Sequence, residues 1–107
     1  TSTVGIINET PCSPPINSGL FSSMAEKGDV MGIFTGHDHD NNYIGCLHGI
    51  SLGYGTKTGL DNYGALEKGA RIIEIYENER RFKTWIRSLD SNPKFTVVFP
   101  DSFIETK

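Results

Sequence analysis

The sequence predicts an α/β fold, which as an isolated piece is α+β: one helix, one two-faced strand, then mostly antiparallel strands. A helix leading into a strand that is apolar on both faces indicates an α/β arrangement. The short glycine-punctuated strands that follow indicate an antiparallel meander at the edge of a larger sheet system. With 107 residues, the chain has room for one domain at most.

The first predicted element is a helix that follows a proline-rich loop. Residues 9–17 contain three prolines, which helix interiors and central strands exclude. Asn17 or Ser18 can cap the helix, and Gly28 can end it. Four apolar side chains then fall on one face of this helix: Leu20, Phe21, Met24 and Ala25.

The second predicted element is a central strand at residues 29–36, covered on both sides. Val30 and Phe34 fall on one of its faces and Met31 and Ile33 on the other. Four strands are predicted after it, at residues 43–47, 50–54, 71–76 and 82–89, and the last two flank a charged tip and form a hairpin. A last apolar run at residues 95–99 indicates a short strand in the tail.

Composition and charge exclude several classes of protein. The net charge is −3 and no stretch is densely basic, so no nucleic-acid partner is expected. No apolar run approaches the ~20 residues of a membrane span. Cys12 and Cys46 are expected to be free thiols, with pairing left open for an exported protein. The chain begins without Met, which we interpret as a processed product or an excised piece, so its compartment, exported or periplasmic included, stays open.

The residues most suggestive of chemistry are His37 and His39, which follow Gly36 at the end of the predicted strand. In extended backbone, residues two apart point the same way with Cα atoms ~6–7 Å apart. That spacing suits one metal ion or two ions ~3.5–4 Å apart, and strand ends of α/β sheets are where ligands bind. Neighbouring polar side chains can orient the rings: Asp38, Asp40, Asn41 and Asn42. The alternative is a pair of solvent-exposed histidines that bind no metal.

Residues 36–39 match the Gly-His-x-His signature of calcineurin-like metallophosphoesterases. The segments around it resemble the carboxy-terminal part of bacterial and plant phosphoesterases related to purple acid phosphatases; they are residues 17–21, 36–43, 54–59, 69–73 and 84–87. The resemblance covers residues 5–90 or so. It implies that residues 1–90 are the C-terminal part of a metallophosphoesterase domain, one side of a two-sheet sandwich, and that residues 91–107 are a tail.

The resemblance also implies a function for the intact protein, the hydrolysis of phosphate esters at two divalent or trivalent metal ions of the zinc, manganese or iron class. His37 would bind one ion and His39 the other. The family's other ligand motifs, Asp-x-His, Gly-Asp-x-x-Asp, Gly-Asn-His and a further His, do not occur in this chain. The active site is therefore expected to need the missing N-terminal part of the domain. Without that part, the chain is expected to be inactive and to self-associate through exposed apolar surface.

Several other residues have two interpretations. His48 could complete a three-histidine zinc site but is favoured as a surface residue. Lys57 and Arg71 could be phosphate-side cations but are favoured as solvated or salt-bridged side chains. The aromatic residues Tyr54, Tyr63, Phe82 and Trp85 are expected to pack. The alternative for the whole chain is a non-catalytic β-rich binding or structural module, with or without a structural zinc.

Overall fold

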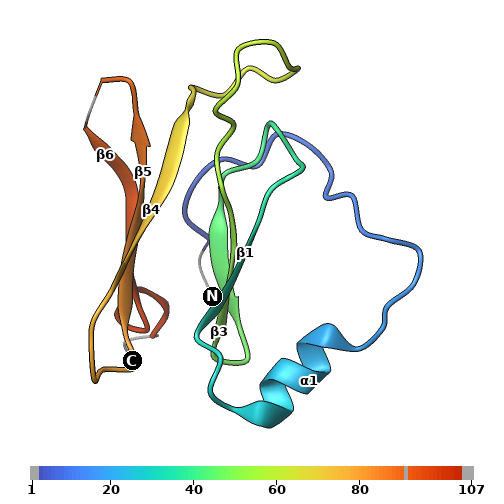
Figure 1. Cartoon of the computed structure of the whole chain (residues 1–107), viewed down its shortest axis with the longest axis vertical. Coiled ribbons are helices and arrows are strands. Elements are labelled where there is room, and N and C mark those ends of the chain that lie inside the picture. The colour runs from blue at the N-terminus through green and yellow to red at the C-terminus, as the bar shows by residue number, and fades with distance from the viewer. Residues whose placement is uncertain (1–2, 91, 105–107) are drawn as a thin grey trace.

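Two three-stranded sheets face each other in the computed structural model, which describes residues 3–90 and 92–104 (Figure 1). The first sheet has the order β1-β3-β2 and the second the order β4-β5-β6. The element bounds are α1 Leu20–Lys27, β1 Gly32–Thr35, β2 Ile44–Leu47, β3 Ile50–Tyr54, β4 Gly69–Ile75, β5 Phe82–Ser88, β6 Pro93–Phe99 and the 3-10 helix η1 Asp101–Phe103. One helix and mostly antiparallel strands, as the sequence predicts, are confirmed, and the arrangement is consistent with a piece of a two-sheet sandwich.

The core lies between the two sheets. Ile44 on β2 is fully buried against three residues of the second sheet, Phe82, Val97 and Phe99. The Phe82 ring stacks on Phe99 with 5.1 Å between centroids and meets the edge of Phe34 at 5.8 Å. Large aromatic side chains bury the most apolar area per residue, so these rings account for much of the attraction between the sheets.

The prediction that the strand at residues 29–36 is central is wrong for this chain. β1 is an edge strand paired only with β3, in parallel, and no residue of β1 is fully buried. The central strand of the first sheet is β3, where Gly53 leaves room for Phe34: a Cβ at residue 53 would lie 3.0 Å from that ring. An apolar pattern on both faces reports what covers a strand from above and below, and it carries no information on how many strands flank it.

The helix forms where predicted but is capped by a different residue. Its N-cap is Gly19, in left-handed backbone at φ 83°, and Asn17 instead accepts a hydrogen bond from the Gly19 N–H at 3.0 Å. Gly28 ends the helix as predicted, at φ 81°, with its N–H donated to the Met24 carbonyl. No residue of α1 is buried, and Leu20 is 65% exposed. The apolar face of the helix is thus only partly covered within the described residues, where Phe21 and Met24 are half-buried.

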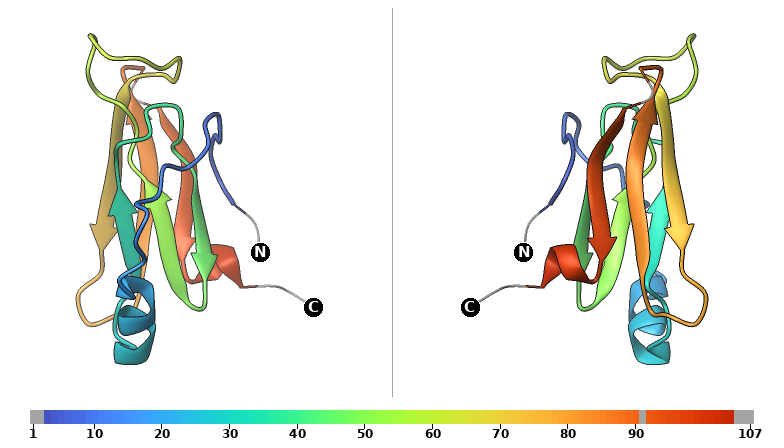
Figure 2. Two further views of the ribbon diagram at one scale, coloured as in Figure 1. Left: turned by 90° about the vertical axis from the view of Figure 1, so that its right-hand side faces the viewer. Right: turned by 90° about the vertical axis from the view of Figure 1, so that its left-hand side faces the viewer.

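The second sheet carries the predicted hairpin. β4 and β5 pair antiparallel on either side of the charged tip at residues 77–81, and β6 pairs antiparallel with β5 (Figure 2). Cys12 and Cys46 are both free thiols. None of the described helices is long and apolar enough to cross a membrane.

Candidate functional site

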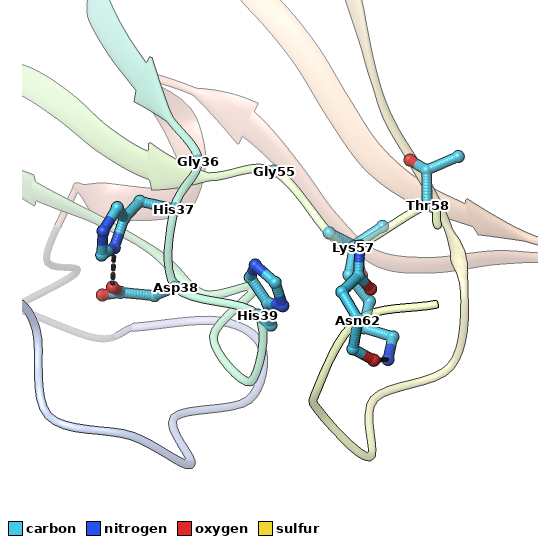
Figure 3. Close-up of a pocket in the computed structure, with 9 residues that line it drawn as sticks. Gly36, His37, Asp38, His39, Gly55, Lys57, Thr58 and Asn62 are labelled. Carbon is cyan, nitrogen blue, oxygen red and sulfur yellow. Dashed lines mark hydrogen bonds and ion pairs between the residues drawn. The ribbon is translucent and has the colours of Figure 1, made fainter. Parts of the chain in front are cut away.

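A cavity of about 230 Å³ opens where β1 and β3 end (Figure 3). Because these two strands are parallel, their carboxyl ends lie side by side, and the loops that follow them form opposite walls. Residues after β1 and residues after β3 line it: Gly36, His37, Asp38, His39, Gly55, Thr56, Lys57, Thr58 and Asn62. The structure therefore brings both predicted histidines to one strand-end cavity.

The backbone between the histidines is not extended, which corrects the sequence expectation. His37 has a φ of 78°, in the left-handed region that non-glycine residues seldom occupy. The two rings consequently leave the main chain in different directions (Figure 3). His37 Nδ1 lies 3.1 Å from the Asp38 carboxylate. A carboxylate accepts hydrogen bonds, so in the neutral ring this contact places the proton on Nδ1 and leaves Nε2 with its lone pair.

Asp38 holds the His37 ring from a buried position. Its side chain is only 3% exposed, whereas the His37 side chain is 76% exposed. Hydrogen bonding from the Tyr54 hydroxyl and the His37 ring lowers the pKa of Asp38 below its ordinary value of 3.8, so the carboxylate stays ionised at neutral pH. Burial, and then the hydrogen bond to Asp38, raise the pKa of Tyr54 to about 12. Asp38 is thus a fixed anion aimed at a histidine, the position expected of a residue that orients a metal-binding ring.

Asn41 and Asp40 fasten neighbouring loops to the histidine segment. Asn41 is fully buried and accepts hydrogen bonds from the Asn8 and Glu9 N–H groups at 3.0 and 3.1 Å. Its amide donates to Asp38 at 3.2 Å, so it also orients that carboxylate. Asp40 accepts from the N–H of Ala65 at 2.6 Å. Of the polar residues predicted to orient the rings, Asp38 contacts a histidine directly, Asn41 acts through Asp38, and Asp40 ties down the loop after β3.

His39 is held by a residue that sequence reasoning assigned to packing. Its Nδ1 lies 2.9 Å from the main-chain carbonyl of Tyr63, and the two rings stack with 4.0 Å between centroids. A carbonyl can only accept, so His39 also carries its proton on Nδ1 and keeps the Nε2 lone pair. No sequence signal marks this contact, because 24 residues separate its two members.

The two predicted phosphate-side cations are both committed to protein oxygens. Lys57 lines the cavity, but its ammonium donates to the carbonyls of Asn62, Tyr63 and Gly64. Arg71 bridges the two sheets instead, with Nε donating to the Tyr54 carbonyl and Nη2 to the Asn42 carbonyl, both at 2.7 Å. Burial lowers the pKa of Arg71 to about 10. A phosphate-side role stays a prediction for both residues, and the geometry supports it less for Arg71 than for Lys57.

His48 lies apart from the other two histidines. It stands at the turn between β2 and β3, near the ring of Phe21, and does not line the cavity. No group of three or more His, Cys, Asp or Glu side chains in residues 3–90 and 92–104 is placed to hold a metal ion. The three-histidine zinc site is therefore not formed, and the described part of the chain brings two histidines, but no third ligand with them, to the cavity.

A paired-histidine segment at a strand-end cavity beside two facing sheets fits the class of calcineurin-like metallophosphoesterases. Comparison with known proteins gives the family. The chain is 38% identical over 103 residues to probable inactive purple acid phosphatase 14 of Arabidopsis thaliana, covering 86% of this chain and 26% of that protein. It is 36% identical to probable inactive purple acid phosphatase 29 of the same plant over 86 residues, which cover 78% of this chain and 22% of that protein. The chain is a homologue of the purple acid phosphatases.

These relatives are much longer than this chain, and their names describe inactive phosphatases. The chain spans about a quarter of the length of the curated relatives it matches. Those relatives are themselves named as probable inactive phosphatases. A third one, probable inactive purple acid phosphatase 28 of the same plant, is 31% identical to the chain. No family model matches the chain. No solved structure matches it either.

Proposed function

We propose that this chain supplies His37 and His39 to a two-metal phosphoesterase centre, one ligand to each ion, within a longer protein. The observation that carries the proposal is that both imidazole rings donate from Nδ1 to a protein oxygen. Each has an acceptor at Nδ1, the Asp38 carboxylate or the Tyr63 carbonyl, and both line one cavity. Each ring therefore keeps an Nε2 lone pair, the form in which histidine binds a metal. The residues present fit this role.

Two bound ions of the zinc, manganese or iron class would lower the pKa of a water and polarise a phosphate ester. The chain's own contribution is orientation. Asp38 and Tyr63 fix the two rings, and Asn41 fixes Asp38. The intact protein would then hydrolyse phosphate esters, with the carboxylate-bearing ligands supplied by the rest of its domain. The chain by itself is expected to show no turnover.

A second candidate, a non-catalytic binding or structural module, is favoured by the names of the relatives. Proteins called inactive purple acid phosphatases match this chain over most of its length. The described residues offer two histidines and no third ligand beside them. If the protein is such a non-catalytic module, it would keep the cavity, and any metal ion bound there would have a structural role.

The test uses the intact protein with three alanine variants. His37→Ala and His39→Ala are each expected to remove most turnover of a chromogenic phosphate ester, and each is expected to lose a different ion by elemental analysis. An ion that lacks one ligand binds weakly and no longer holds the reacting groups in line. His48→Ala, away from the cavity, is the matched control and is expected to match wild type.

The outcomes separate the two candidates. Two retained ions and normal turnover in both variants would contradict the metal-ligand role. Wild-type protein that binds metal at these histidines without turnover, with zinc, manganese or iron supplied, would favour the non-catalytic module. The 107-residue chain serves as the negative control, because it lacks the carboxylate motifs of the family.

A further inference from the structure

The loop between β3 and β4 folds back over His39, and Tyr63 makes its two closest contacts there. The Tyr63 ring lies on the His39 ring with 4.0 Å between centroids and 9° between planes. The Tyr63 carbonyl receives the His39 Nδ1 proton at 2.9 Å. One residue thus restrains both the plane of the imidazole and the site of its proton.

Tyr63 is itself fastened from the opposite side. Its hydroxyl donates to the Glu9 carboxylate, with 2.8 Å to Oε1. The other oxygen of Glu9 accepts the Asp40 N–H at 2.7 Å. Asp40 follows His39 directly, so Glu9 joins the tyrosine to the main chain beside the histidine that it covers. The stacked pair is therefore held at both ends.

The main chain on either side of Tyr63 is also fixed. Lys57 donates to the Tyr63 carbonyl at 3.3 Å and to the Gly64 carbonyl at 2.7 Å. The Tyr63 carbonyl has two lone pairs, so it can serve Lys57 and His39 together. Gly64 has a φ of 117°, and a Cβ there would lie 2.9 Å from Asp40 Oδ1 and 3.1 Å from His39 Cβ. A glycine is required for the loop to approach the histidine this closely.

From these contacts we infer that Tyr63 is a positioning residue for His39. The stacked ring and the carbonyl hold the imidazole in one orientation with Nε2 unprotonated and available on the cavity side. His37 is positioned by a different device, the buried Asp38 carboxylate. The inference rests on the proposed function, in which His39 Nε2 binds a metal, and it assigns to an exposed loop tyrosine a role at that site.

The experiment observes the histidine rings of the metal-free chain by NMR with ¹⁵N labelling. His39 is expected as the Nδ1–H tautomer, and its ring protons are expected to be shifted upfield by the Tyr63 ring. Tyr63→Leu is expected to abolish the upfield shift, whereas Tyr63→Phe retains the stacked ring and the shift. His48 serves as an internal reference, and backbone amide signals of β4 and β5 confirm that each variant is folded. Tyr63 is 57% exposed, so neither variant disturbs the core.

A Zn²⁺ titration of the intact protein and the same variants links the contact to metal binding, because the chain alone supplies only one ligand to each ion. Residues that orient a metal-bound histidine typically contribute about 10–100-fold in metal affinity. Tyr63→Leu keeps the main-chain carbonyl and removes only the stacked ring, so it is expected to weaken the Zn²⁺ response of His39 by no more than the lower end of this range, and Tyr63→Phe to leave it closer to wild type. A wild-type His39 protonated on Nε2, or identical ring shifts in wild type and Tyr63→Leu, would overturn the inference. The metal-free spectra of the chain test the positioning alone, while intact wild-type protein whose His39 ignores Zn²⁺ counts against the proposed function.

Discussion

At the scale of single residues, each of the two histidines is oriented by a hydrogen-bond partner, the Asp38 carboxylate or the Tyr63 carbonyl. Asp38 is the clearest case, because its carboxylate is buried and receives hydrogen bonds from His37 and Asn41. A buried anion beside an imidazole fixes the tautomer of the ring and raises its basicity as a ligand. Any change at Asp38 should therefore reach the metal through His37.

Asp38→Asn is expected to reduce metal affinity in the intact protein by about 10–100-fold without unfolding it. The side-chain amide of this variant has only one oxygen, so it can accept a hydrogen bond from His37 or from Asn41 but not from both. Its NH₂ group then faces the other donor. Metal affinity by competition with a chelator, beside circular dichroism for the fold, measures the effect. Asp29→Asn, at an exposed carboxylate outside the cavity, is the control. Equal affinities for the two variants would show that Asp38 does not orient a ligand.

The sequence predicted part of this site and missed part of it for physical reasons. His37, His39 and Asp38 are adjacent in the chain, so a short pattern brings them to notice. Tyr63 and Glu9 approach His39 and Asp40 from 24 and 31 residues away, and only the folded loops bring them there. The left-handed backbone at His37 was also missed, because a two-residue spacing is compatible with more than one backbone conformation.

At the scale of elements, Arg71 joins the two sheets. It lies on β4 and donates to carbonyls at residues 42 and 54, both in the first-sheet half of the chain, and to the Thr84 hydroxyl on β5. A single planar guanidinium serves three acceptors, which an ammonium on a flexible stem cannot do in the same geometry. The contact is a fixed point between β4 and the end of β3 that borders the cavity.

Arg71→Met is expected to destabilise the chain by about 2–4 kcal/mol, because partly buried carbonyls lose their donor while the apolar stem is kept. Urea denaturation measures the change in the free energy of unfolding. Arg71→Lys is the matched variant. It keeps the positive charge but lacks the planar guanidinium with its several donors, so it is expected to recover only part of the lost free energy of unfolding. A full recovery by lysine would mean that charge alone matters here.

The turn between β5 and β6 carries an ion pair whose effect depends on pH. Lys94 on β6 lies 3.0 Å from Asp90, and this ammonium, with the Asn92 N–H, lowers the pKa of Asp90 below its ordinary 3.8. The folded state then binds the Asp90 proton less tightly than the unfolded state does. Its stabilisation is present above pH 3.8 and is lost as the pH falls through the lower folded value.

Asp90→Asn is therefore expected to be slightly less stable than wild type at neutral pH, with the difference shrinking as the pH is lowered from about 5 toward about 2. The effect is small because both side chains are partly exposed and screened by solvent. Thermal unfolding at several pH values measures it, with Asp61→Asn as the exposed control. A stability difference that grows on acidification would have the wrong sign for this ion pair.

At the scale of the whole molecule, the two sheets do not cover each other completely. Ile73 pairs with Thr84 and Ile75 with Phe82, and directly paired residues share one face of a sheet. Thr84 and Phe82 are buried on the face toward the first sheet, yet Ile73 is 40% exposed and Ile75 69%. Among the described residues the first sheet ends at β1, with no strand beyond that edge to extend the cover over β4.

This geometry explains why the sequence placed the strand at residues 29–36 in the centre of a sheet. Its two apolar faces are typical of a strand covered from above and below, which most central strands are, but β1 has a neighbour on one side only among the described residues. The free edge of β1 and the exposed Ile73 and Ile75 together form a surface on which another part of a longer protein could pack. The short chain length relative to the relatives agrees with such an additional part.

The chain on its own is therefore expected to self-associate, as a symmetric dimer that buries β4 and the free edge of β1. Ile73→Lys combined with Ile75→Lys should shift the chain to monomer, because a lysine on that face cannot be buried unpaired at an interface. Leu60→Lys combined with Leu89→Lys is the matched control: it adds the same two charges at more exposed apolar residues, 79% and 87% accessible, outside the strands. Light scattering over a range of concentrations gives the mass of each variant. A wild-type chain that stays monomeric at high concentration, or a dimer that the double variant leaves intact, would show that this face is not where a partner packs.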